Sequence, residues 1–136
     1  MGFDLVKISE LANSIHHFGD VFKRKLFTKG ELNYAHSGIG LCEERLATRF
    51  AAKEAVIKAL QFSEAGIGWR EIEVLRLQDG NCEVALHGRV AKLAKSMGVS
   101  KISLSLSHEG DYAGAVVALH CSYPEVNNSP YNRRSL

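Results

Sequence analysis

Glu54 is the residue of this sequence whose type and position most strongly suggest chemistry. It lies in a predicted amphipathic helix over residues 46–60, in which Phe50, Glu54 and Ile57 share one face at about 100° per residue. Burying a carboxylate among apolar side chains is costly unless a cation compensates for it. That cation is either Lys58, one helical turn further on, or a bound metal ion. A purely structural Glu54–Lys58 pair on a solvated edge is the remaining interpretation.

The first half of the chain is expected to form one short strand and three helices. Asp4 lies on the side of the strand opposite to Phe3 and Leu5, because side chains alternate along a strand. Thr28-Lys-Gly-Glu31 is a capping box, the pattern typical of a helix N-terminus. The expected elements are a strand over residues 2–6 and helices over residues 8–18, 28–34 and 43–60.

The residue pattern in the second half of the chain predicts paired strands. Asp79-Gly80 is a strong hairpin signal, and Gly98 is typical of a residue that ends a helix. The expected strands cover residues 71–77, 82–86, 101–107 and a continuously buried 113–119, with a helix over 90–97. This order favours an α+β fold: a single compact domain over residues 1–121, with a mostly antiparallel sheet packed on one long and several shorter helices, and a loose tail over 122–136.

Composition excludes several classes of protein. The chain has 136 residues, of which 46% are hydrophobic and 24% charged, as in an ordinary globular domain. A net charge of +2 and the lack of an aromatic stacking face argue against a nucleic-acid binder. Local basic residues suit phosphate or acidic protein partners instead. These are Lys23-Arg24-Lys25, called the basic cluster below, and Arg45, Arg49, Lys53 and Lys58 along the long helix.

The cysteine pattern and hydropathy bear on location. Cys42, Cys82 and Cys121 are scattered without a CxxC spacing, and we find no secretory leader. An odd number of scattered cysteines is typical of the reducing cytoplasm. No apolar run approaches the ~18 residues needed to cross a bilayer. We therefore expect a cytoplasmic protein that does not enter the membrane.

Separated motifs of the chain resemble the 4′-phosphopantetheinyl transferases, most closely the small bacterial holo-(acyl carrier protein) synthases. They are Gly2-Phe3-Asp4, Arg49-Phe-Ala-Ala-Lys-Glu-Ala-Val-Ile-Lys58, and Ser105-Leu-Ser-His108 followed by Tyr112-Ala113. The resemblance covers about residues 2–119, and the central helix motif is its most specific part. It implies transfer of the 4′-phosphopantetheine arm of coenzyme A to a serine hydroxyl of a carrier protein, with release of adenosine 3′,5′-bisphosphate.

The resemblance also implies a magnesium site. Attack on a doubly negative pyrophosphate requires a metal that neutralises the phosphoryl oxygens, and magnesium is commonly held by one or two carboxylates with phosphates and waters. Asp4 and Glu54 are the implied ligands, although Asp4 alone is typical of a cap or surface strand position. Glu54 and Lys58 are the implied catalytic residues, Lys58 by contacting the phosphates. A salt bridge between Lys58 and Glu54 is compatible with these roles.

Besides Lys58, five residues are implied contacts of coenzyme A. Arg49 resembles the arginine near the nucleotide end of the coenzyme, and a solvated helix charge is an equally good interpretation of it. His108 lies in the Ser-His turn that relatives place beside the coenzyme, whereas a lone turn histidine is usually incidental. Ser107 and the backbone of Gly66 and Gly68 are weaker candidates for the same pocket.

The partners implied are coenzyme A, an acyl or other carrier protein, and two further copies of the chain. Small members of the family form homotrimers with active sites between subunits, which a buried strand near Val116-Val117 would support. Glu10 departs from the family, since relatives commonly have arginine there, so a carrier from fatty-acid or from polyketide biosynthesis is equally plausible. The alternative function is a non-catalytic relative that binds a carrier protein or a nucleotide; retention of Asp4, Glu54 and Lys58 argues against it.

Overall fold

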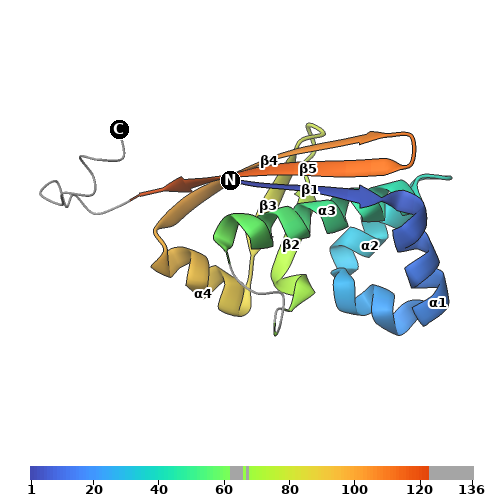
Figure 1. Cartoon of the computed structure of the whole chain (residues 1–136), viewed down its shortest axis with the longest axis horizontal. Coiled ribbons are helices and arrows are strands. Elements are labelled where there is room, and N and C mark those ends of the chain that lie inside the picture. Colours follow the sequence, from blue (N-terminus) through green and yellow to red (C-terminus); the bar gives the residue numbers. More distant parts are fainter. Residues whose placement is uncertain (62–65, 67, 123–136) are drawn as a thin grey trace, which may run out of the picture.

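The structure is a computed structural model that describes residues 1–61, 66 and 68–122. Residues 123–136 of the predicted tail, and residues 62–65 and 67 of the glycine-containing loop, lie outside this description. The elements, shown in Figure 1, are β1 (Gly2–Lys7), α1 (Ile8–Leu26), α2 (Lys29–His36), α3 (Cys42–Leu60), η1 (Trp69–Glu71), β2 (Ile72–Arg76), β3 (Cys82–Leu86), α4 (Gly88–Ser96), β4 (Val99–Glu109) and β5 (Tyr112–Cys121).

Two antiparallel sheets carry the fold. The larger has the strand order β1-β5-β4, and the smaller is the β2–β3 hairpin. The α-helices lie on one side of the larger sheet, with α3 running beneath it, so that the other side of that sheet is left uncovered (Figure 1). The prediction of an α+β fold with a mostly antiparallel sheet is confirmed. Among the described residues, no helix combines the length and hydrophobicity that crossing a bilayer requires.

Local signals placed most elements correctly. The capping box is present, since the Thr28 hydroxyl accepts from the Glu31 N–H at 3.2 Å and Glu31 Oε1 accepts from the Thr28 N–H at 2.8 Å. The hairpin turns at Gly80, whose φ of 90° favours glycine. The first helix extends beyond its predicted end because the chain resumes helical geometry after a kink at Gly19 (φ 80°, ψ −168°).

In β1 the apolar side chains are exposed and the charged side chain between them is buried, the reverse of an ordinary amphipathic strand. Phe3 and Leu5 are each 57% exposed, whereas Asp4 between them is only 6% exposed. The predicted continuous burial of residues 113–119 is wrong for the same reason: Val116 is 41% exposed and Val117 is fully buried. Because α3 covers one side of the sheet only, alternate residues of the strands point to a side that the chain itself leaves open.

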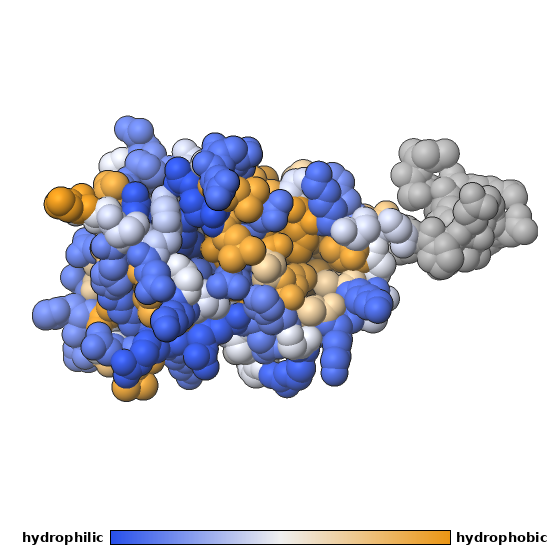
Figure 2. All heavy atoms as spheres, turned by 180° about the vertical axis from the view of Figure 1, so that it is seen from behind, coloured by the Kyte–Doolittle hydropathy of each residue, from blue (hydrophilic) through white to orange (hydrophobic). Residues whose placement is uncertain are grey.

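Close packing of β1 on α3 depends on Gly2. A Cβ atom at this position would lie 2.0 Å from the carbonyl oxygen of Ala55, well inside van der Waals contact. Glycine therefore lets the strand pass directly over the helix, which places Asp4 above the α3 segment that contains Glu54 and Lys58. The buried part of α3 contributes much of the main core. Figure 2 shows the face opposite to that of Figure 1, where apolar residues gather near the middle among hydrophilic ones.

Candidate active site

A cavity of about 330 Å³ brings together the two carboxylates predicted to bind metal. It lies between β1, α1 and α3, and both Asp4 and Glu54 line it. Lys7 and Glu10 also line it, one from the end of β1 and the other from the first turn of α1. Leu5, Val6, Leu11, Ser14, Phe22 and Phe50 complete the lining. Charged groups from β1 and the adjoining first turn of α1 thus converge with Glu54 of the distant α3 on one space.

Asp4 has one satisfied and one unsatisfied carboxylate oxygen. Oδ1 accepts a hydrogen bond from Lys58 Nζ at 2.6 Å, and the side chain is only 8% exposed. Lys58 Nζ also donates to the backbone carbonyl of Phe3 at 3.2 Å. Within the described part of the chain, Oδ2 is buried and has no hydrogen-bond partner. The structure shows that Lys58 forms an ion pair with Asp4 on a neighbouring strand, and the Glu54–Lys58 pair that the sequence suggested stays a prediction.

These donors fit a magnesium ion that relies on substrate for part of its coordination. A buried carboxylate oxygen without a donor is costly unless a cation or water satisfies it. No group of three or more Asp, Glu, His or Cys side chains able to hold a metal occurs among residues 1–61, 66 and 68–122. Two carboxylates completed by phosphates and water are the usual magnesium arrangement in phosphoryl-transfer sites. Asp4 and Glu54, on one cavity, match that donor set.

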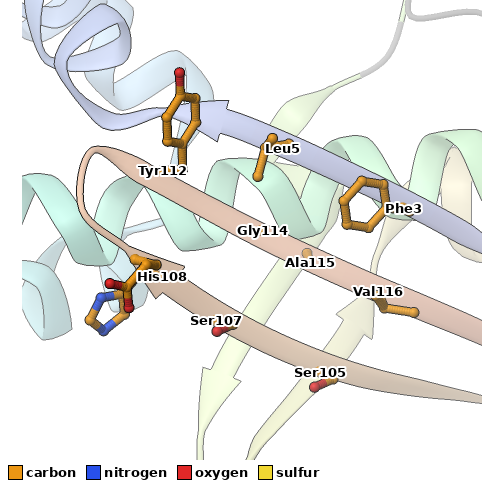
Figure 3. A pocket seen from close by; sticks show the side chains of 10 residues that line it. Phe3, Leu5, Ser105, Ser107, His108, Tyr112, Gly114, Ala115 and Val116 are labelled. Atoms are coloured by element: carbon orange, nitrogen blue, oxygen red, sulfur yellow. The ribbon is translucent and has the colours of Figure 1, made fainter.

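His108 and Ser107 lie elsewhere, on consecutive positions of β4. His108 faces α3, because its partner on β5, Ala113, is fully buried, whereas Ser107 faces the uncovered side of the larger sheet. They line a second cavity of about 250 Å³ formed by β1, β4 and β5. Figure 3 shows Phe3, Leu5 and Tyr112 projecting on this side, with α3 behind the sheet. The ring of His108 contacts the Glu44 carboxylate of α3 through Nδ1. The structure therefore does not bring His108 and Ser107 into the carboxylate cavity of the same chain.

Arg49 is not a solvated helix charge. It is 4% exposed, and its guanidinium lies 4.3 Å from the centre of the Tyr34 ring. Its Nη1 donates to the carbonyl of Arg45 at 3.3 Å, whereas Nε is buried without a partner among the described residues. Burial lowers the pKa of Arg49 below its ordinary value. Arg45 and Arg76 also approach Tyr34, at 4.2 and 5.3 Å from its ring centre, a cluster that sequence analysis missed.

Lys53 does not belong to an exposed basic face of the long helix, contrary to what the sequence suggested. It is fully buried and forms an ion pair with Glu31 at 2.7 Å, where both side chains are inaccessible to solvent. Its Nζ also donates to the carbonyls of Trp69 at 3.0 Å and Ile72 at 2.5 Å. Burial lowers the pKa of Lys53, and the Glu31 carboxylate opposes that effect. Helical periodicity could have indicated the burial of Lys53, because position 53 falls on the same apolar side of the helix as Phe50.

The glycine-containing loop is attached to α4 by charged side chains. Glu71 Oε2 accepts from the Gly68 N–H at 3.1 Å, and Glu71 Oε1 accepts from the Arg89 N–H at 2.5 Å. The guanidinium of Arg89 donates to the carbonyl of Gly66. Gly66 has a φ of 80°, which favours glycine. Sequence analysis named Gly66 and Gly68 as candidate coenzyme contacts and missed Glu71 and Arg89, which hold them.

Comparison with known proteins gives a consistent set of matches. Residues 1–117 match the sequence model of the 4′-phosphopantetheinyl transferase superfamily. The chain is 39% identical over 119 residues to the holo-(acyl-carrier-protein) synthase of Koribacter versatilis (strain Ellin345), covering 87% of this chain and 94% of that protein. For the protein of the same name from Moorella thermoacetica, identity is 41% over 128 residues, covering 91% and 95%. The solved ACPS–CoA complex of Chronobacterium ammoniagenes matches with a TM-score of 0.81 and 36% identity, over 90% of this chain and 96% of that one.

Proposed function

Because this chain belongs to the 4′-phosphopantetheinyl transferase superfamily, we propose that it is a holo-(acyl carrier protein) synthase. It transfers the 4′-phosphopantetheine arm of coenzyme A to a serine hydroxyl of an apo carrier protein and releases adenosine 3′,5′-bisphosphate. The observation that carries this proposal is that Asp4 and Glu54, from the start and the middle of the matched region, line one cavity next to Lys58. A cytoplasmic location, inferred from the cysteine pattern, is part of the proposal.

The residues of the carboxylate cavity have distinct roles in this reaction. Asp4 and Glu54 would hold a magnesium ion, and the chemistry supplied by the bound ion is neutralisation of charge on the pyrophosphate oxygens. Asp4 Oδ1 and the Phe3 carbonyl fix the ammonium group of Lys58, whose side chain is 55% exposed. Lys58 is thus held in place while it remains open to solvent. Such a fixed positive charge favours the charge that develops as the leaving phosphate departs.

We further propose that the active enzyme is a homotrimer with sites shared between subunits. Two observations support it. The uncovered side of the sheet exposes Phe3, Leu5, Tyr112 and Val116, each between 41% and 57%, an apolar surface that a second copy would cover (Figure 3). Ser107, an implied coenzyme contact, lies on that side and does not line the carboxylate cavity, so a neighbouring copy would unite the two sets.

The trimer is tested by the oligomeric state of Val116→Glu. A carboxylate in the buried centre of an interface is strongly unfavourable, so this variant should sediment as a monomer and lose transfer activity. Leu75→Glu is the matched control, since Leu75 is 38% exposed on β2 of the other sheet. A monomeric, active unmodified protein, or a trimeric and active Val116→Glu variant, would refute the shared site.

The proposed function is tested by labelling an apo carrier protein with coenzyme A. In the presence of magnesium, the purified chain should increase the mass of an apo acyl carrier protein by that of one phosphopantetheine arm, measured by mass spectrometry, and EDTA should stop the addition. Asp4→Asn and Glu54→Gln should each abolish transfer and retain the far-UV circular dichroism spectrum. Binding of coenzyme A or carrier without any transfer to a panel of carriers would favour the non-catalytic alternative.

A further inference from the structure

Glu10 is the acidic residue of the carboxylate cavity that the proposed mechanism leaves without a role. It lies in the first turn of α1, is exposed to solvent and lines the cavity together with Asp4 and Glu54. Within the described part of the chain, its carboxylate makes no hydrogen bond or ion pair. The buried and unsatisfied Oδ2 of Asp4 is an independent sign that this cavity receives a ligand.

The other two carboxylates of the cavity already have a role in the proposed function. Asp4 is bound to Lys58 at 2.6 Å, and the proposed function assigns both Asp4 and Glu54 to magnesium. Glu10 does not join them in a group of three side chains able to hold a metal, a group that is absent from the described residues. Glu10 therefore lines the space in which phosphate would be bound without being placed to bind the ion itself. A nucleophile entering the cavity would meet a carboxylate in that position.

The reaction requires a proton acceptor. A serine hydroxyl is a weak nucleophile, and a positioned carboxylate that accepts its proton in the transition state contributes typically about 10²–10⁴-fold to the rate. Lys7, also on the cavity, is a cationic donor and cannot serve. His108 does not line this cavity and contacts Glu44 instead. Glu10 is the carboxylate of this cavity that remains available.

We propose, resting on the proposed function, that Glu10 is the general base that accepts the proton of the carrier serine. The serine oxygen forms a bond to the β-phosphorus of coenzyme A as the bond from that phosphorus to the bridging oxygen breaks. The electron pair of the broken bond stays on the 5′-phosphate of adenosine 3′,5′-bisphosphate. The serine proton passes to the Glu10 carboxylate and from there to solvent, which restores the enzyme.

Glu10→Gln tests the proposal, with Glu43→Gln as its matched control. Glu43 is also an exposed glutamate in the first turn of a 19-residue helix, but it does not line the cavity. Both substitutions remove one negative charge near a helix N-terminus, so both should weaken the helix to a similar extent. Glu10→Gln should lower kcat at saturating carrier by about 100-fold or more, with an unchanged KM for coenzyme A, whereas Glu43→Gln should leave kcat unchanged.

A second variant separates a base from a docking residue. Glu10→Ala should regain part of its kcat when formate is added, because the small carboxylate can occupy the space of the deleted side chain; a lost docking contact would not respond to formate. A kcat for Glu10→Gln within threefold of the control, or a change confined to the KM for the carrier, overturns the inference. Absence of transfer by the unmodified enzyme would instead refute the proposed function along with it.

Discussion

Replacement of Lys53 by methionine is expected to destabilise the fold more than any other removal of a single charge on α3. Methionine keeps most of the side-chain volume and deletes only the ammonium group, which pairs with Glu31 at 2.7 Å with both side chains at 0% exposure. Glu31 retains the Thr28 and Val74 N–H donors, at 2.8 and 2.9 Å, and loses its only described cation. Breaking a fully buried pair in this way costs about 3–5 kcal/mol.

The loss is large relative to the free energy of unfolding of a typical domain, about 5–15 kcal/mol. It can be measured by urea unfolding at a fixed protein concentration, because a trimer would make the midpoint concentration-dependent. Lys92→Met, at an exposed position of α4, is the control and should change stability by no more than about 0.5 kcal/mol.

A double variant isolates the ionic part of the effect. Lys53→Met combined with Glu31→Met leaves no uncompensated buried charge, although it still strands the Thr28 and Val74 N–H groups, each at about 1 kcal/mol. The double variant should therefore be more stable than Lys53→Met alone. A loss below about 1 kcal/mol for Lys53→Met, or a double variant no more stable than that single one, would refute the reasoning.

Three further outcomes are expected. Lys58→Met should lower kcat more than it weakens coenzyme binding, measured by pre-steady-state kinetics and calorimetry; an unchanged kcat would assign Lys58 to structure. Burial alone raises the pKa of Glu73, but hydrogen bonds from Thr28 and His87 bring it below the ordinary 4.5, so its stabilising contribution is complete above that pH and is lost as the pH falls through the folded-state pKa. Lowering the pH should accordingly reduce the free energy of unfolding less in Glu73→Gln than in the unmodified protein. Charge reversal of the basic cluster should raise the KM for the carrier and weaken its salt dependence, with the KM for coenzyme A unchanged.

Local sequence signals were sufficient where they involve neighbouring residues. The capping box at Thr28 and the turn at Asp79-Gly80 are formed by residues within a few positions of each other, so short-range geometry alone specifies them. The periodicity of α3 similarly predicted the helix that carries Glu54. The family motifs, read from the sequence, implied a transferase of the superfamily to which the chain belongs.

Burial of charge was not predictable in the same way. Lys53 is tolerated in the core because Glu31, 22 positions earlier and on another helix, meets it there, and Asp4 is tolerated because Lys58 reaches it from 54 positions away. Periodicity records which side of a helix a residue occupies, but not whether a partner from a distant segment will neutralise it. For this reason the predicted basic face of α3 was wrong at Lys53 and Arg49.

The sequence by itself determined the secondary structure and the set of chemically suggestive residues, because both depend on residue type and short spacing. Only the tertiary structure decided which side of the larger sheet is covered. Gly2 lets β1 lie directly on α3, which turns Asp4 inward to the cavity and leaves Phe3 and Leu5 outside. Alternation of side chains along a strand separates its two sides but does not indicate which side will be covered. Packing of the strand against the helix decides that.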